Sequence, residues 1–262
     1  IDADGVDRVD FINTMTTMIL GHAPKIVMQA VEEQLAKGVA YNAPNEHQVR
    51  LAKTLCQRIP SFDLVRFTNS GTEATLNTIR AARAVTGKSK IAKVEGGYHG
   101  SHDQVSVSVR VNPAKAGERS HPDAMAATEG LGEGTLDQVV VMPFNETAIA
   151  REILERNKDE LAAVIIEPIL GSVGMLPATT EFLTMLREFT AANGIILIFD
   201  EVISYRAASG GAQEYYGITP DMTSLGKIIG GGFSIGAFGG SKAIMDLYDP
   251  TVADGPRVAH AG

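Results

Sequence analysis

The chain has 262 residues, of which 44% are hydrophobic and 21% are charged, as expected of a globular protein that can bury a sizeable core. Its formal net charge of −8 argues against nucleic acid as a partner, and no apolar run approaches the roughly 20 residues that a membrane-spanning helix needs. The single cysteine, Cys56, cannot form an internal disulfide, which favours a reducing compartment such as the cytoplasm.

The N-terminal part of the chain is predicted to form a hairpin and two helices. An Asp-Gly turn signal in "IDADGVDRVDFI" separates two short apolar pieces, which predicts a β-hairpin within residues 1–13. Apolar side chains then recur at helical spacing over residues 24–37, where Pro24 stands at the helix start, and over residues 46–58. Both of these segments are predicted to be amphipathic helices.

From residue 64 onward, strands and helices alternate. The strands are near-continuous apolar runs, which is typical of a sheet covered on both faces by helices, so we predict an α/β fold. The predicted strands cover residues 64–68, 90–94, 138–142, 161–168, 195–200, 221–226 and 235–240. The predicted helices run from the "NSGTEA" segment to residue 84, over 146–157, over 179–192 and up to residue 247.

Residues 110–136 interrupt this alternation with a polar stretch rich in Gly and Pro. Such a composition predicts a long loop. Long loops inside compact domains often serve as lids, and a mobile surface loop fits the same pattern equally well. The sequence leaves both interpretations open.

Open α/β sheets bind ligands beyond the carboxyl ends of their strands, so the residues that follow each strand are the candidate site. Ser70, Gly71 and Thr72 stand between a strand and a helix start, where free N–H groups and two hydroxyls can hold an anion. A simple helix N-cap with a turn glycine explains the same residues. The P-loop pattern is absent, which favours a single phosphate over a triphosphate.

Two charged residues at strand ends point to a specific cofactor. Asp200 ends the apolar strand "IILIFD", where a buried carboxylate needs a cation or a hydrogen-bonding partner. Lys227 stands in "SLGKIIGGG", between a strand and an apolar glycine-rich segment; desolvation there lowers the pKa of an amine and frees it for attack on an aldehyde. A phosphate cradle, an amine and a carboxylate for a ring nitrogen together describe a site for pyridoxal 5'-phosphate (PLP).

Other residues near these strand ends complete the predicted site. Tyr98 offers a flat face for the cofactor ring, and Val202 is placed to cover the other face. A core aromatic at Tyr98 and a merely packed histidine at His99 are the simpler alternatives. The six histidines show no metal-binding spacing, so no metal site is predicted.

Five motifs occur in an order and at separations that closely resemble the class III aminotransferases of PLP fold type I. They are "NSGTEA", "GGYHG", "IIEP", "FDEV" and "LGKIIGGG". The segment from "DEV" to "GAFGG" is most similar to the branch that includes glutamate-1-semialdehyde 2,1-aminomutase. The resemblance implies a three-layer αβα sandwich with a mostly parallel mixed sheet.

The resemblance also implies a role for each candidate residue. Lys227 would bind the cofactor covalently and carry protons, Asp200 would face the ring nitrogen, and Ser70, Gly71 and Thr72 would hold the phosphate. Tyr98 would stack on the ring, with Val202 and His99 close by. Asn145 would contact the region of the ring hydroxyl, and Glu167 would support the site from behind.

The expected activity is amino-group transfer between an amino acid and an oxo compound. The alternatives are an intramolecular aminomutase, which makes a tetrapyrrole precursor, and a PLP-binding module without catalytic activity. The family implies a homodimer with the active site at the subunit interface. Residues 1–262 would then form the PLP-binding large domain, and both ends look cut, so we expect the small domain and part of the N-terminal segment to lie outside this sequence.

Three short stretches depart from the usual aminomutase pattern. They are Thr14 and Met15 before "MILGH", "ISYR" after "DEV", and "FSIG" after the glycine run. The family places these positions near the substrate. Relatives with such changes include transaminases that act on β-amino acids and other amino acids.

Overall fold

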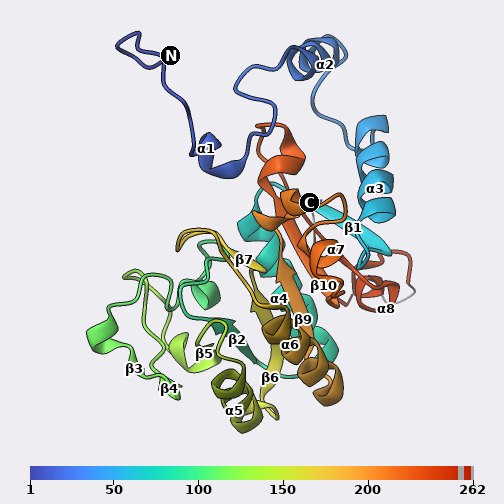
Figure 1. Cartoon of the computed structure of the whole chain (residues 1–262). Coiled ribbons are helices and arrows are strands. Elements are labelled where there is room, and N and C mark those ends of the chain that lie inside the picture. The colour runs from blue at the N-terminus through green and yellow to red at the C-terminus, as the bar shows by residue number, and fades with distance from the viewer. Residues whose placement is uncertain (253–256, 261–262) are drawn as a thin grey trace.

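Figure 1 shows the computed structural model of the chain, which describes residues 1–252 and 257–260. A seven-stranded sheet with the strand order β1-β11-β10-β9-β6-β2-β5 forms its centre. Its strands are β1 (Leu64–Thr68), β2 (Lys90–Val94), β5 (Val139–Met142), β6 (Leu161–Ile166), β9 (Ile196–Asp200), β10 (Met222–Gly226) and β11 (Gly236–Gly240). The helices are α1 (Asn13–Thr16), α2 (Lys25–Leu35), α3 (Glu46–Arg58), α4 (Gly71–Thr86), α5 (Thr147–Asn157), α6 (Thr180–Asn193), α7 (Ala212–Tyr216) and α8 (Lys242–Met245).

The directions of the strands decide where a ligand can bind. Strands β5, β2, β6, β9 and β10 pair in parallel, whereas β11 runs antiparallel to both β10 and β1. All strands except β11 therefore end at the same edge of the sheet. The loops that follow them meet there, as the general rule for open α/β sheets requires.

The sheet is buried on both faces because its central strands are apolar at nearly every position. In β9, Ile196 and Ile198 pack in one core with α4 and α8, whereas Leu197 and Phe199 pack in a second core with α5 and α6. Alternate residues of a strand point to opposite faces, so each apolar run supplies both cores. The predicted three-layer αβα sandwich with a mostly parallel sheet is confirmed.

Polar caps and glycines set the ends of the helices that flank the site. The Ser70 hydroxyl accepts a hydrogen bond from the Glu73 amide at 3.2 Å and caps α4, which ends at Gly87 with a φ of 69°. Thr179 caps α6 in the same way, and Gly194 ends it with a φ of 61°. Ser and Thr supply the missing acceptor at a helix start, and glycine adopts the left-handed conformation at its end without steric strain.

The predicted N-terminal hairpin is wrong. Residues 1–12 form a turn, in which the Asp2 amide donates to Val6 O at 3.0 Å, but no strand flanks it. The Asp2 carboxylate accepts from the Asp4 and Val6 amides and so satisfies the turn locally. An isolated two-stranded hairpin is at best marginally stable, and Figure 1 shows this segment extending away from the sheet.

The polar stretch at residues 110–136 has more structure than predicted. It contains a short hairpin of β3 (Gly117–Glu118) and β4 (His121–Pro122), anchored by an ion pair between Arg119 and Glu146 at the start of α5. Its function as a lid stays a prediction.

Among the described residues, no helix combines the length and the apolar character that crossing a bilayer requires. The predicted domain, residues 1–262, includes residues 253–256 and 261–262, which lie outside the described ones.

Candidate functional site

A cavity of about 370 Å³ lies at the carboxyl edge of the sheet. Its volume is within the range that is typical of small-molecule sites. The loops after β1, β2, β6, β9 and β10 all contribute to its wall, together with two residues of the N-terminal segment. The lining residues are Thr14, Thr17, Asn69, Ser70, Gly71, Thr72, Tyr98, His99, Gly100, Glu167, Asp200, Val202, Ile203, Lys227, Gly232, Phe233, Ser234 and Ile235.

The first turn of α4 forms one wall of this cavity. A helix of 16 residues begins at Gly71 and directs its free N–H groups and the positive end of its dipole at the cavity. Glycine is required at two nearby positions: a Cβ at Gly71 would lie 2.9 Å from Val202 Cγ2, and a Cβ at Gly236 would lie 2.1 Å from Ser70 O. This close packing leaves the helix start open as an anion cradle.

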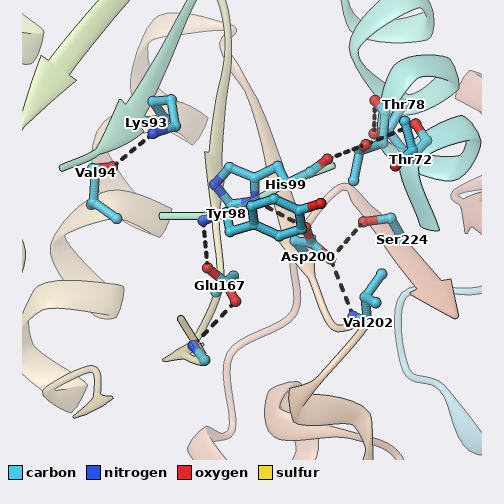
Figure 2. Close-up of polar contacts among 12 residues, drawn as sticks. Thr72, Thr78, Lys93, Val94, Tyr98, His99, Glu167, Asp200, Val202 and Ser224 are labelled. Atoms are coloured by element: carbon cyan, nitrogen blue, oxygen red, sulfur yellow. Dashed lines mark hydrogen bonds and ion pairs between the residues drawn. The ribbon is translucent and has the colours of Figure 1, made fainter. Parts of the chain in front are cut away.

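Asp200 lies at the end of β9, is only 2% exposed, and faces the cavity. Its Oδ1 accepts hydrogen bonds from the Val202 amide at 3.1 Å and from Ser224 Oγ at 3.2 Å (Figure 2). Its Oδ2 lies 2.9 Å from His99 Nδ1. Burial lowers the pKa of His99, so the ring is neutral, and Nδ1 carries the proton because a carboxylate can only accept.

Lys227 follows β10 directly and begins a short 3-10 helix, Lys227–Gly230. Its φ of 49° lies in the left-handed region, which costs a non-glycine residue of order 1 kcal/mol and is most often found at functional sites. Burial lowers the pKa of its amine, while the negative charges of Asp200 and Glu167 act in the opposite direction. The lowered pKa increases the share of neutral amine that is free to act as a nucleophile or base.

Glu167 lies behind the Tyr98 loop and is 2% exposed. Burial, followed by the negative charge of Asp200, raises its pKa to about 8, so it holds a proton at neutral pH. Its two carboxyl oxygens accept the Tyr98 amide at 2.8 Å and the Gly171 amide at 3.2 Å (Figure 2). Glu167 therefore joins the loop after β2 to the segment after β6.

Glu201, which follows Asp200 in the sequence, has a structural role. Glu201 is fully buried, and its carboxylate accepts from the amides of Ala212 and Gln213 and from the Ser204 hydroxyl. These contacts hold the start of α7 against the end of β9. Of the two adjacent acids, Asp200 thus belongs to the cavity and Glu201 to the scaffold.

Comparison with known proteins identifies the family of this chain. The sequence profile of the class III aminotransferases matches residues 1–256. The chain belongs to the class III aminotransferase family. The resemblance stated from its motifs is thereby confirmed.

Individual relatives in this family include two kinds of enzyme. The glutamate-1-semialdehyde 2,1-aminomutase of Methanocaldococcus jannaschii is 45% identical over 95% of this chain. The solved structure of an omega-transaminase from Sphaerobacter thermophilus is 51% identical, covers 100% of this chain and superposes with a TM-score of 0.95. A solved structure described as a transaminase with PLP bound is 40% identical over 100% of the chain, with a TM-score of 0.91.

This chain is shorter than these class III relatives. It spans 57% of the M. jannaschii aminomutase and 59% of each of the two transaminase structures. The activity of the whole protein is therefore treated below as a proposal.

The structure brings nine of the ten predicted site residues of this class III chain to the cavity. The exception is Asn145, which does not line it. Its side-chain amide donates to Pro177 O at 3.1 Å and accepts from the Thr179 amide at 2.8 Å. Both ends of the amide thus bind the segment before α6, and the contact of Asn145 with a cofactor ring stays a prediction.

Two buried polar residues near the class III site were missed by the sequence reasoning. Ser224 donates to Asp200, and Lys93 lies fully buried in β2 close to His99. The available signal was a polar residue inside an otherwise apolar strand, in "MTSLG" and in "KIAKV". The three stretches that depart from the aminomutase pattern do reach the cavity, through Thr14, Ile203 and Phe233 with Ser234.

Proposed function

We propose that this chain is the cofactor-binding part of a PLP-dependent aminotransferase that moves an amino group between an amino acid and an oxo compound. The observation that carries the proposal is that Lys227 and Asp200 line the same cavity, beside the open N-terminus of α4. An amine, a buried carboxylate and an anion cradle are the three groups that PLP requires. A binding module has no need of a desolvated amine on a residue with a left-handed backbone, as at Lys227.

The residues present fit PLP at each of its polar ends. The free amides at the start of α4, with Ser70 and Thr72, would hold the phosphate. Asp200 would face the ring nitrogen, and Tyr98 and Val202 would bound the ring. When bound, PLP supplies an aldehyde that captures amines and an electron-poor ring that stabilises a carbanion at the substrate Cα.

Two side chains of this protein would control where protons are held during the reaction. The Lys227 amine lies in the cavity with a lowered pKa, which suits it both to attack an aldehyde and to take up a proton as a base. Asp200 accepts from His99, Val202 and Ser224, which keeps it oriented. Its negative charge would favour a protonated ring nitrogen.

Transfer between two molecules is favoured over the intramolecular aminomutase reaction. Identity is higher to the omega-transaminase, at 51%, than to the M. jannaschii aminomutase, at 45%. In addition, all three departures from the aminomutase pattern lie on the cavity wall, where they would meet a substrate. The aminomutase stays the second candidate, because several curated aminomutases are 43% to 45% identical to this chain.

One assay separates these two candidates. The PLP-loaded protein is mixed with glutamate 1-semialdehyde and no second substrate. We expect no sustained formation of 5-aminolevulinate and, with an amino donor, turnover only when an oxo acceptor is added. Rapid formation of 5-aminolevulinate without an acceptor would establish the aminomutase instead.

The anion cradle gives a second prediction. The change Gly71→Ala places a methyl group 2.9 Å from Val202 Cγ2, which forces apart the helix start and the residue that bounds the cofactor ring. We expect the Kd for PLP, measured by absorbance titration of the apo protein, to rise about 10-fold, since preorganised polar contacts are lost when their spacing changes. Gly132→Ala is the matched control, because its new methyl group would meet other atoms only at 3.5 Å or more. Equal PLP affinities for the two variants would contradict the cradle.

We also propose that the protein is a cytoplasmic homodimer whose active site lies at the subunit interface. Thr14 and Thr17 reach the cavity from a segment that carries strongly exposed apolar side chains, including Phe11 at 92% and Ile12 at 65%. Exposed apolar surface of this kind is common where a second subunit docks. The single thiol, Cys56, is compatible with a reducing compartment.

A further inference from the structure

Lys93 is a fully buried lysine that the proposed reaction does not use. It lies in β2, between β6 and the edge strand β5, with 0% of its surface exposed, although lysines are almost never fully buried. Burial lowers its pKa to about 7, while the negative charges of Glu167 and Glu95 act in the opposite direction. Such a group is costly to bury, so its position calls for an explanation.

The contacts of the Lys93 ammonium group tie a loop together. Its Nζ donates to Val107 O at 2.7 Å and to Val94 O at 3.2 Å. These two carbonyls stand at the two ends of the loop that carries Tyr98 and His99 into the cavity. Lys93 therefore links the two ends of this loop by hydrogen bonds from the protein interior.

A second, independent observation lies on the far side of the His99 ring. His99 Nε2 is buried and has no hydrogen-bond partner among the described residues. A Cβ on Gly97 would lie 3.1 Å from this nitrogen and 3.2 Å from Val94 O, the same carbonyl that Lys93 Nζ contacts. In Figure 2, one ring nitrogen of His99 faces Asp200 and the other faces the side on which Lys93 and Val94 lie.

Charge connects the two side chains. Burial is the main cause of the lowered pKa of His99, and the positive charge of Lys93 lowers this pKa further. The ammonium group has three donors, and two of them are used by the carbonyls of Val94 and Val107. A positive charge near the His99 ring disfavours a proton on the buried Nε2, because like charges repel each other.

We propose that Lys93 is a positioning residue for the cofactor site, which closes the loop carrying Tyr98 and His99 and keeps the imidazole proton on Nδ1, facing Asp200. This inference deepens the proposed function and rests on it. With the proton on Nδ1, His99 always donates to Asp200 Oδ2, and the carboxylate stays an oriented acceptor opposite the ring nitrogen of PLP. The other titratable groups that face this arrangement are Glu167 and Glu95 on the side of Lys93, and His102 near His99.

The first test needs no substitution in the protein that is measured. The PLP-loaded wild type is labelled with ¹⁵N-histidine, and the His99 signals are assigned by their loss in His99→Gln. We expect His99 to be neutral with its proton on Nδ1 from about pH 6 to pH 7, where Lys93, with a pKa of about 7, still carries much of its positive charge. A proton on Nε2 in this range would overturn the inference, whether or not any Lys93 variant folds.

The second test uses Lys93→Met, which keeps the length of the side chain and removes its charge and donors. Lys90→Met is the matched control on the same strand, since Lys90 pairs with Glu160 away from the cavity. We expect Lys93→Met to raise the Kd for PLP about 10-fold, as is usual when a supporting partner is removed, and to shift the pKa of the visible absorbance by about 0.5 unit. Lys90→Met is expected to change neither, and an unchanged Lys93→Met contradicts the proposal.

A double variant shows whether Lys93 acts through His99. In the His99→Gln background, Lys93→Met should no longer shift the pKa of the absorbance, because the two changes remove one shared interaction. An undiminished shift in that background would assign Lys93 a role independent of His99 and overturn the inference. Failure of the proposed function looks different: the wild type itself would then develop no visible absorbance with PLP.

Discussion

Replacing Lys227 by alanine is expected to lower the rate of amino-group transfer by about 10,000-fold or more, because one side chain supplies both the covalent attachment and the base. Lys227 Nζ is the only amine on the cavity wall among the described residues. The start of α4 and Asp200 remain in place in this variant, so PLP still binds, but without covalent attachment.

The measurement combines two readings on the PLP-loaded protein. Initial rates are taken at saturating amino donor and oxo acceptor, and the absorbance spectrum is recorded before substrate is added. The Lys227→Ala spectrum should resemble that of free PLP, whereas Lys242→Ala, a change of an exposed lysine paired with Asp246, should match the wild type in both readings. If Lys227→Ala transferred amino groups at a normal rate, the assignment of the site would be wrong.

The pH dependence of this amine follows from its surroundings. Burial lowers the pKa of Lys227, so its neutral form is available at lower pH than for an exposed lysine. The charges of Asp200 and Glu167 oppose this shift. Glu167, however, holds a proton below its pKa of about 8 and contributes its negative charge mainly above that value.

The sequence predicted the sheet well because its strands obey one strong constraint. Parallel strands covered on both faces must be apolar along their whole length, and such runs are visible without any structure. The residues after these runs were then placed at one edge by topology alone, which is why Ser70, Tyr98, Asp200 and Lys227 meet at the cavity. The strongest predictions thus came from burial combined with strand direction.

The sequence did not reveal where a polar group has a competing partner. Asn145 follows its strand as predicted, but it adopts a φ of 59°, and its side-chain amide forms hydrogen bonds with Pro177 O and the Thr179 amide. In the N-terminal segment, Asp2 satisfies the turn that was expected to start a hairpin. The partners of Asn145 depend on which segments come together in the fold, whereas those of Asp2 lie within four residues and replace the strand pairing that a hairpin needs.

Polar residues inside buried strands were the least predictable part of the site. Lys93 and Ser224 each interrupt an apolar run, and a single interruption does not reveal whether the side chain faces solvent, a cavity or a charge. The structure shows both fully buried: Ser224 donates to Asp200, and the charge of Lys93 acts on His99. A buried polar residue inside an apolar strand is therefore a useful signal for residues that support a site.

Replacing Asp200 by asparagine is expected to lower the maximal transfer rate by about 1,000-fold while PLP remains bound, since the loss falls on stabilisation of charge during the reaction. Asparagine has nearly the same shape, and its carbonyl oxygen can still accept from the Val202 amide and Ser224 Oγ. Its NH₂ group, however, would face His99 Nδ1–H, so two donors would oppose each other. It also lacks the negative charge that keeps a ring nitrogen protonated.

The matched control for this change is Asp221→Asn, because Asp221 is also an acid on the sheet but pairs with Arg187 and the Leu197 amide at the opposite end of the strands. We expect Asp221→Asn to lower stability to heat and leave the maximal rate per bound PLP unchanged. Asp200→Asn should do the reverse, with a large loss of rate and a shifted absorbance spectrum. A rate for Asp200→Asn within about 10-fold of the wild type would mean that another group holds the ring proton, because a charge partner in a buried site contributes far more than that.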